Sequence, residues 1–208
     1  MEHLLSDKKL LIFDCDGVLF HSEEANIAYF EECLRRTNQG PLDEELRAKA
    51  AYMAIAQLFS EIISDPQEAA KAYEISQAIP YDPYLSRMNR AFDFEEVLLP
   101  LKEQFFLAVA SNRSISLTKI FRHFDLFDFF HFKVSARDRK PKPAPDMLLA
   151  CLDYFGFTAS EAIFIGDAVS DAEAAKNGGI DYIHVGNDSR FQCISSVASL
   201  FSLQDAAE

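Results

Sequence analysis

Short apolar runs recur along the chain and are separated by longer segments with helical spacing of apolar residues. The runs cover residues 10–13, 105–110, 130–134, 162–165 and 181–185. Runs of this length, bounded by turn residues, are typical of buried strands in a parallel sheet. The spacing of Leu117, Ile120 and Phe121 is one example of the three- and four-residue periodicity that predicts the intervening helices. This alternation predicts an α/β fold with a mainly parallel sheet flanked by helices.

The segment 21–92 interrupts this alternation because it shows helical patterns and no strand. We expect four helices here, over residues 22–38, 43–62, 65–79 and 82–92. Each begins near a residue that can cap a helix, namely Ser22, Asp43, Asp65 and Asp82. The segment is too long for a plain crossover between two strands. We therefore expect a core of residues 1–20 and 93–208, with 21–92 inserted as a small α-helical subdomain. It would act either as a lid or as a static insertion.

Charge and composition limit the class of protein. The 208 residues carry 33 acidic against 20 basic side chains, a formal net charge of −13. This balance argues against a nucleic-acid partner, whereas a local cluster of cations can still bind a small anionic substrate. No apolar run is long enough to cross a membrane, and the start MEHLLSDKK lacks a signal-peptide pattern. The four cysteines show no metal-binding spacing, so we expect a reduced, soluble, cytoplasmic protein in which Cys15 packs inward.

Two pairs of aspartates each follow an apolar run. Asp14 and Asp16 come directly after residues 10–13, and Asp167 and Asp171 follow residues 162–165. Ligands of open α/β sheets sit beyond the carboxyl ends of the strands, where both pairs would lie. Two like charges about 4 Å apart repel by roughly 4 kcal/mol at an effective dielectric constant near 20. A hard cation such as Mg²⁺ would offset this repulsion. A solvated turn explains one such pair equally well, but two pairs favour a cation site.

Smaller polar groups follow the other predicted strands. Ser111 and Asn112 come at the end of residues 105–110, where hydroxyl, amide and backbone N–H groups can hold phosphate oxygens. Lys142 stands between prolines and can act as a fixed point charge for an anion. Each pattern is weak alone, because Ser/Asn turns and exposed basic turns are common. Six phenylalanines between 121 and 132 favour core packing over a stacking site for a base.

Taken together, these residues resemble the haloacid dehalogenase superfamily over nearly the whole chain. The four motifs are Asp14-x-Asp16-Gly-Val, Ser111 after the second strand, Lys142 in Lys-Pro-Ala-Pro-Asp, and Gly166-Asp167-x-x-x-Asp171. A helical insert after the first motif resembles the small-cap subgroup, which includes phosphoglycolate phosphatases, other sugar-phosphate phosphatases and β-phosphoglucomutases. The resemblance implies a Rossmann-like core and Mg²⁺-dependent phosphoryl transfer.

The resemblance also implies roles for individual residues. Asp14 would be the nucleophile that forms an aspartyl-phosphate, and Asp16 would be the acid and base for the leaving oxygen and the attacking water. Ser111 and the backbone of Asn112 would hold the phosphoryl group. Lys142 would neutralise its charge.

The metal ligands follow from the same resemblance. Asp167 would hold Mg²⁺ together with Asp14 and the carbonyl oxygen of Asp16. Asp171 would ligate the ion or orient its ligands. The alternative lysine, Lys140, also precedes a proline, but the Pro-Ala-Pro-Asp sequence fits better after Lys142.

The expected activity is hydrolysis of a small phosphorylated metabolite, such as phosphoglycolate or a sugar phosphate. A phosphomutase on the same scaffold is the alternative, and a non-catalytic phosphoacceptor module is disfavoured by the Asp-x-Asp spacing and the helical insert. Arg113 lies beside the expected phosphate site and is a candidate substrate contact. Cations of the insert can bind a second anionic group or form solvated helix faces; these are Arg35, Arg87 and Arg90. His21 stands where relatives often carry Asp or Asn. The expected assembly is a monomer or a small homo-oligomer.

Overall fold

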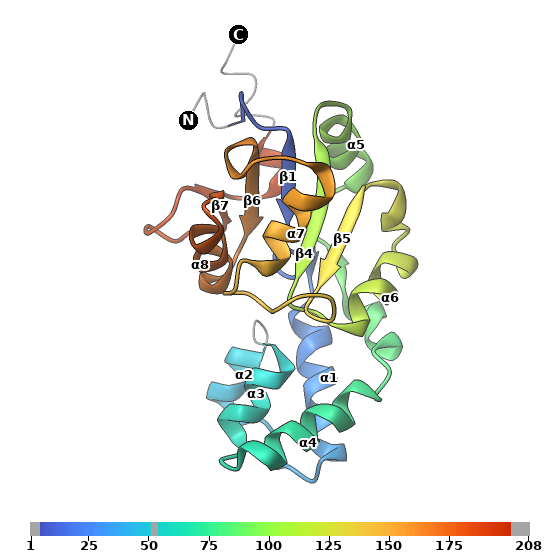
Figure 1. Cartoon of the computed structure of the whole chain (residues 1–208). Helices are drawn as coiled ribbons and strands as arrows, with labels where there is room; N and C mark the ends of the chain where they lie inside the picture. Colours follow the sequence, from blue (N-terminus) through green and yellow to red (C-terminus); the bar gives the residue numbers. More distant parts are fainter. Residues whose placement is uncertain (1–4, 51–53, 201–208) are drawn as a thin grey trace.

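A computed structural model describes residues 5–50 and 54–200 of the chain. Its main element is a six-stranded sheet with the order β5-β4-β1-β6-β7-β8, and every neighbouring pair is parallel. The strands are β1 (Leu10–Phe13), β4 (Phe106–Ser111), β5 (Phe132–Ser135), β6 (Ala162–Gly166), β7 (Asp181–Val185) and β8 (Cys193–Ile194). The predicted parallel α/β architecture is therefore confirmed (Figure 1).

Strand β1 lies inside the sheet and is buried on both faces. Leu11 and Phe13 pack on the face covered by α5 (Phe94–Gln104) and α6 (Ile115–His123), whereas Leu10 and Ile12 pack against α7 (Asp146–Phe155) and α8 (Val169–Gly178). Successive side chains of a strand point to opposite faces, so a strand covered on both sides must be apolar throughout. This burial explains the uninterrupted run at residues 10–13.

The phenylalanine-rich segment 121–132 contributes to the core, as expected. Phe121, Phe129 and Phe130 are buried in the cluster on the α5–α6 face, which also contains Cys15. The Phe121 and Phe130 ring centroids lie 5.8 Å apart. The expectation that Cys15 packs inward is confirmed by its complete burial.

A helical segment occupies the chain between β1 and β4. It contains α1 (Glu23–Arg36), α2 (Glu44–Ala50), α3 (Ile55–Ile62), α4 (Pro66–Gln77) and the short 3₁₀ helix η1 (Asp82–Arg87). Figure 1 shows α1 to α4 gathered beyond one end of the sheet, apart from the helices on its faces. None of the helices formed by residues 5–50 and 54–200 combines the length and apolarity needed to span a bilayer.

The structure corrects three details of the predicted segment. The chain enters and leaves it through a two-stranded antiparallel sheet, β2 (Phe20–His21) with β3 (Asn89–Arg90), which is too short to produce a recognisable period. The single helix expected over 43–62 is two helices, because Ala54 is extended (φ −68°, ψ 141°) ahead of α3. Residues 51–53, including Met53 at one of the apolar positions with helical spacing, lie outside the described residues. The helix expected over 82–92 is the 3₁₀ helix η1 and ends at Arg87.

The predicted helix caps are partly confirmed. The Asp65 carboxylate accepts a hydrogen bond from the Gln67 N–H at 2.8 Å, and Asp43 accepts one from the Leu46 N–H at 2.8 Å. Ser22 precedes α1 as expected, but its side chain makes no capping hydrogen bond. Its hydroxyl donates to Asp16 instead, so a tertiary contact replaces the local cap.

Candidate active site

The predicted site residues meet at the carboxyl ends of three neighbouring strands. Asp14 and Asp16 follow β1, Ser111 ends β4, and Asp167 follows β6. The loop before α7 supplies Lys142 and the first turn of α8 supplies Asp171. These six residues, together with Asn112 and Arg113, line one cavity of about 400 Å³. The strand order explains the meeting, because β4 and β6 flank β1.

Lys142 lies at the centre of the site and joins two carboxylates. Its Nζ lies 2.7 Å from Asp14 Oδ1 and 2.7 Å from Asp171 Oδ1, and it donates to the Ala110 carbonyl at 3.2 Å. Burial alone would lower the pKa of Lys142, but Asp14 and Asp171 raise it above its ordinary value. The buried Lys142 ammonium is therefore charged, and the two carboxylates balance its charge. Lys140, the alternative in the sequence, is exposed.

Asn112 fixes the loop that carries this lysine. The Asn112 side-chain amide donates to the Lys142 carbonyl at 3.1 Å, and its oxygen accepts from the Lys142 N–H at 2.7 Å. The peptide bond from Lys142 to Pro143 is cis. The sequence suggested a phosphate contact through the Asn112 backbone, whereas the side chain positions the lysine.

Three carboxylates crowd beside Lys142. Asp14, Asp167 and Asp171 each offer an oxygen atom, and these atoms all lie within 4.8 Å of one another. Burial first, and then repulsion from Asp171 and Asp16, raises the pKa of Asp14 to about 7, against the lowering influence of Lys142. Burial and the charges of Asp14 and Asp171 raise the pKa of Asp167 to about 8. Clustered carboxylate oxygens are the ligands that Mg²⁺ prefers, so this donor set fits that ion.

The backbone holds the Asp171 carboxylate in place and leaves space for that of Asp167. One oxygen of Asp171 accepts hydrogen bonds from the N–H groups of Asp167 at 3.1 Å and Ala168 at 3.2 Å. Gly17 has φ +70°, and a Cβ atom there would lie 1.8 Å from Asp167 Oδ2. A Cβ at Gly166 would lie 2.4 Å from Asp171 Oδ2. The glycines of the first and last motifs therefore leave room for the carboxylates.

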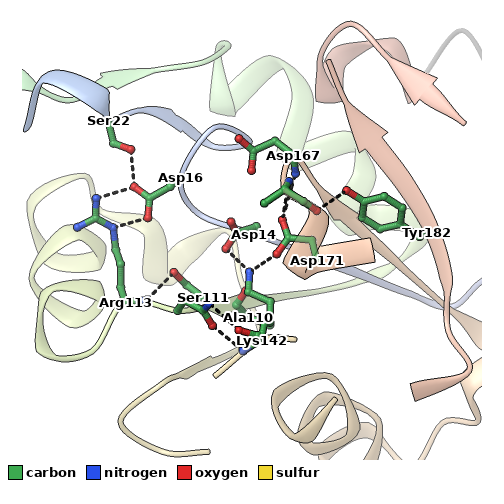
Figure 2. A network of polar contacts seen from close by, with 12 residues as sticks. Asp14, Asp16, Ser22, Ala110, Ser111, Arg113, Lys142, Asp167, Asp171 and Tyr182 are labelled. Carbon is green, nitrogen blue, oxygen red and sulfur yellow. Dashed lines mark hydrogen bonds and ion pairs between the residues drawn. The ribbon is translucent and has the colours of Figure 1, made fainter. Parts of the chain in front are cut away.

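The side chain of Asp16 does not join this cluster. Figure 2 shows it turned toward Arg113 and Ser22. Arg113 Nε donates to Asp16 Oδ2 at 2.7 Å, and Arg113 Nη2 donates to Asp16 Oδ1 at 2.5 Å. Burial would raise the pKa of Asp16, but the Arg113 guanidinium and hydrogen bonds from Arg113, Ser22 and Asn26 hold it below its ordinary value. The resemblance implies that only the backbone carbonyl oxygen of Asp16 contacts the metal. A side chain turned away from the cluster is compatible with that expectation.

Arg113 reaches further, into the helical segment. Its Nη2 donates to Asn26 Oδ1 at 2.7 Å and to the Tyr81 hydroxyl at 3.0 Å, and its guanidinium lies 4.6 Å from the Tyr81 ring centroid. The sequence singled out Arg113 but not Asn26 or Tyr81. Both are ordinary helix and loop residues in the sequence, and only the fold brings them to the site.

The candidate cations of the insert do not reach the cavity. Arg35 pairs with Glu32 at 2.7 Å and Arg90 pairs with Glu95 at 2.8 Å, whereas Arg87 is exposed. None of the three lines the cavity, and neither does His21. Of the two explanations weighed for these arginines, the geometry supports the solvated helix face for Arg35 and Arg87, whereas Arg90 lies on strand β3.

Comparison with known proteins gives consistent matches over nearly the whole chain. The family model described as haloacid dehalogenase-like hydrolase matches residues 11–185. The probable phosphatase IndB of Dickeya dadantii is 27% identical over 191 residues, covering 86% of this chain and 81% of that protein. A phosphoglycolate phosphatase of Nitrosococcus oceani is 24% identical over 186 residues, covering 83% and 81%.

Solved structures share the fold. A haloacid dehalogenase superfamily hydrolase from Geobacter sulfurreducens superposes with a TM-score of 0.72 at 28% identity, covering 95% of this chain and 96% of that one. A putative phosphoglycolate phosphatase from Lactobacillus plantarum gives a TM-score of 0.82 at 20% identity, covering 94% and 99%. The second match has too little sequence identity to show more than a common fold.

Proposed function

The chain belongs to the family of haloacid dehalogenase-like hydrolases, and on that premise we propose that it is a Mg²⁺-dependent phosphatase. It hydrolyses a small phosphorylated metabolite through an aspartyl-phosphate on Asp14. The observation that supports this best is the position of Asp14, which is buried in a cluster with Asp171 and the partly buried Asp167 and touches Lys142. Relatives named as phosphatases, including three phosphoglycolate phosphatases and a pyrophosphatase, support the reaction class.

The metal would be held by carboxylate oxygens of Asp14, Asp167 and Asp171, with the Asp16 carbonyl oxygen as a further ligand. The donor set and the crowding that raises the pKa of Asp14 and Asp167 support this assignment. When bound, Mg²⁺ supplies positive charge that offsets the repulsion between a phosphoryl dianion and the carboxylates.

The protein's own groups then divide the chemistry. An oxygen of Asp14 attacks phosphorus, and the bond from phosphorus to the leaving oxygen breaks as Asp16 gives that oxygen a proton. This step requires Asp16 to be protonated and released from its ion pair with Arg113. A water molecule next attacks the phosphoryl group on Asp14 and passes a proton to Asp16, which frees the Asp14 carboxylate and inorganic phosphate. Lys142 and the Ser111 hydroxyl stabilise the charge on the phosphoryl oxygens, and Asn112 keeps Lys142 in position.

The division of the chain is part of the proposal. Residues 1–20 and 93–208 form the catalytic core, and residues 21–92 form a helical cap that closes over the substrate and excludes water. The support is that Tyr29, Tyr73 and Tyr81 of the segment line the same cavity as Asp14.

Phosphate release from a panel of small phosphate esters tests the proposal. The panel contains phosphoglycolate, sugar phosphates, an alkyl phosphate and an aryl-alkyl phosphate, each assayed with Mg²⁺ and with EDTA. We expect metal-dependent release from at least one ester. Absence of release from every ester, with folded protein and bound Mg²⁺, would contradict it. Isomerisation of a sugar phosphate without net phosphate release would establish the phosphomutase alternative instead.

A further inference from the structure

The part of the cavity wall that comes from the helical segment is built from neutral side chains. The helical segment supplies aromatic and aliphatic groups from α1, α3, α4 and the turn before η1. The main ones are Tyr29, Phe30, Ile55, Tyr73, Ile79 and Tyr81. The polar residues that this segment adds to the lining are the neutral amides Asn26 and Gln77. The part of the segment that the structure describes therefore places no cation on the cavity.

Every cation that does line the cavity, among the described residues, already has an acidic partner. Lys142 is paired with Asp14 and Asp171, and Arg113 is paired with Asp16. Lys119, on α6, is paired with Asp82 of η1. The side chain of Arg113 is only 7% exposed and is also bound to Tyr81 and Asn26, so it is fixed by contacts on several sides.

These pairings limit the charge that a substrate can bring. Four aspartates and three cations line the cavity, a formal charge of −1, and bound Mg²⁺ would bring it to +1 before a phosphoryl dianion enters. A second carboxylate or phosphate on the same substrate would lose its water beside Tyr73 and Ile79 and find no free cation there. An unpaired buried charge is strongly unfavourable, whereas an aromatic ring gains from contact with such a wall.

We propose, resting on the proposed phosphatase function, that the substrate is a phosphate monoester with a single anionic group. Its leaving group is uncharged and presents an aromatic or apolar face to the wall formed by Tyr29, Phe30, Tyr73 and Ile79. Phosphoglycolate and pyrophosphate, the substrates named for several relatives, each bring a second anionic group and are poor substrates. The apolar wall thus sets a substrate preference that differs from the substrates in those relatives' names.

Three esters and one anhydride separate the possibilities in a steady-state assay with Mg²⁺: benzyl phosphate, ethyl phosphate and phosphoglycolate, and the anhydride pyrophosphate. We expect kcat/KM for benzyl phosphate to exceed that for ethyl phosphate by about tenfold, from packing of the ring. It should exceed that for phosphoglycolate by roughly 100-fold, from the unpaired charge. A higher kcat/KM for phosphoglycolate or pyrophosphate than for benzyl phosphate would overturn the inference and leave the phosphatase function standing.

Calorimetric titration with the same compounds keeps the inference testable if no ester is hydrolysed. Tighter binding of benzyl phosphate than of phosphoglycolate, without turnover, would contradict the proposed function and support the assigned specificity. Tighter binding of phosphoglycolate would contradict the specificity itself.

Two substitutions in the cavity lining and one outside it test whether the lining causes the preference for benzyl phosphate. Tyr73→Ala should lower kcat/KM for benzyl phosphate about tenfold and leave ethyl phosphate nearly unchanged. Gln77→Lys, which adds a cation at a partly exposed lining position, should narrow the gap between benzyl phosphate and phosphoglycolate about tenfold. Tyr154→Ala is the matched control, because Tyr154 lies on α7 outside the cavity and is 59% exposed. Equal effects of Tyr73→Ala and Tyr154→Ala, or of Tyr73→Ala on both esters, would overturn the assignment.

Discussion

Arg113 and Asp16 form a two-point ion pair in which Nε and Nη2 of the guanidinium lie 2.7 and 2.5 Å from the two carboxylate oxygens. The Arg113 side chain is 7% exposed and that of Asp16 is 24% exposed. The same Nη2 contacts Asn26 of α1 and the hydroxyl of Tyr81. The pair therefore connects the end of β4, the loop after β1 and the helical segment through one side chain.

Replacing Arg113 should cost more stability than replacing an exposed arginine. Arg113→Met leaves the Asp16 carboxylate with only neutral partners, so we expect a loss of about 3 kcal/mol in the free energy of unfolding. Arg113→Lys keeps the charge but not the two-point geometry and should lose less. Urea denaturation gives both values. The control is Arg35→Met, which removes an exposed pair with Glu32 and should cost under about 1 kcal/mol. Equal losses for Arg113→Met and Arg35→Met would show that the pair adds no stability.

The strands and the acidic cluster could be predicted from the sequence because both leave a local pattern in it. Residues 10–13 are apolar throughout because both faces of β1 are covered, and that burial leaves a clear pattern. Asp14, Asp167 and Asp171 follow such strands, so the rule for parallel sheets places them at one edge. The contacts of Arg113 leave no such pattern. It meets Asn26 across 87 residues of sequence, and no local rule connects the two.

Ser22 shows how a local rule fails at the site. Its position before α1 predicts a helix cap, but its hydroxyl donates to the Asp16 carboxylate, a charged acceptor in a partly buried position. The break within the expected helix at 43–62 is a second case, since no proline or glycine marks it. The contact of Ser22 depends on packing between segments, which periodicity does not report.

Lys142 and Lys140 should respond differently to the same substitution. Lys142→Met removes the cation between Asp14 and Asp171 and should lower the free energy of unfolding by about 3 kcal/mol at pH 8. Lys140→Met, at an exposed position two residues earlier, should change it by less than about 0.5 kcal/mol. Chemical denaturation of the two variants side by side measures the difference. A larger loss for Lys140→Met would contradict the placement of Lys142 in the site.

Asp14→Asn should abolish turnover without unfolding the protein. The amide keeps the shape of the carboxylate but lacks the nucleophilic oxygen anion, so kcat should fall by roughly 10⁴-fold or more. Circular dichroism checks the fold, and phosphate release with the best ester measures kcat. Substantial remaining activity in a folded variant would rule out Asp14 as the nucleophile.

Mg²⁺ should stabilise the protein more at pH 8 than at pH 6. The pKa values of Asp14 and Asp167 are raised to about 7 and about 8, so the metal-free folded state binds more protons than the unfolded chain between about pH 4 and pH 8. These two groups therefore reduce stability as the pH rises through that range. Mg²⁺ requires the ionised carboxylates and competes with protons, so its effect should grow with pH.

Thermal unfolding with and without Mg²⁺ at the two pH values measures this difference. Asp167→Asn is the control, because it removes one of the three clustered carboxylates. It should reduce the Mg²⁺-induced shift of the unfolding midpoint at pH 8. A shift that is larger at pH 6, or unchanged in the variant, would contradict a metal site formed by these carboxylates.

Gly17 should tolerate no side chain, because its backbone conformation and the nearby Asp167 carboxylate both exclude one. Its φ of +70° is a left-handed conformation, and a Cβ atom would lie 1.8 Å from Asp167 Oδ2. Gly17→Ala must therefore strain the turn or displace Asp167, and we expect a loss of about 2 kcal/mol in the free energy of unfolding. Displacement of Asp167 would also weaken Mg²⁺ binding, measured by calorimetry. Gly40→Ala is the matched control, since no atom lies within 4 Å of a Cβ there, and it should leave both quantities nearly unchanged. If Gly17→Ala lowered stability but left Mg²⁺ affinity intact, the turn would be structural and Asp167 would not depend on it.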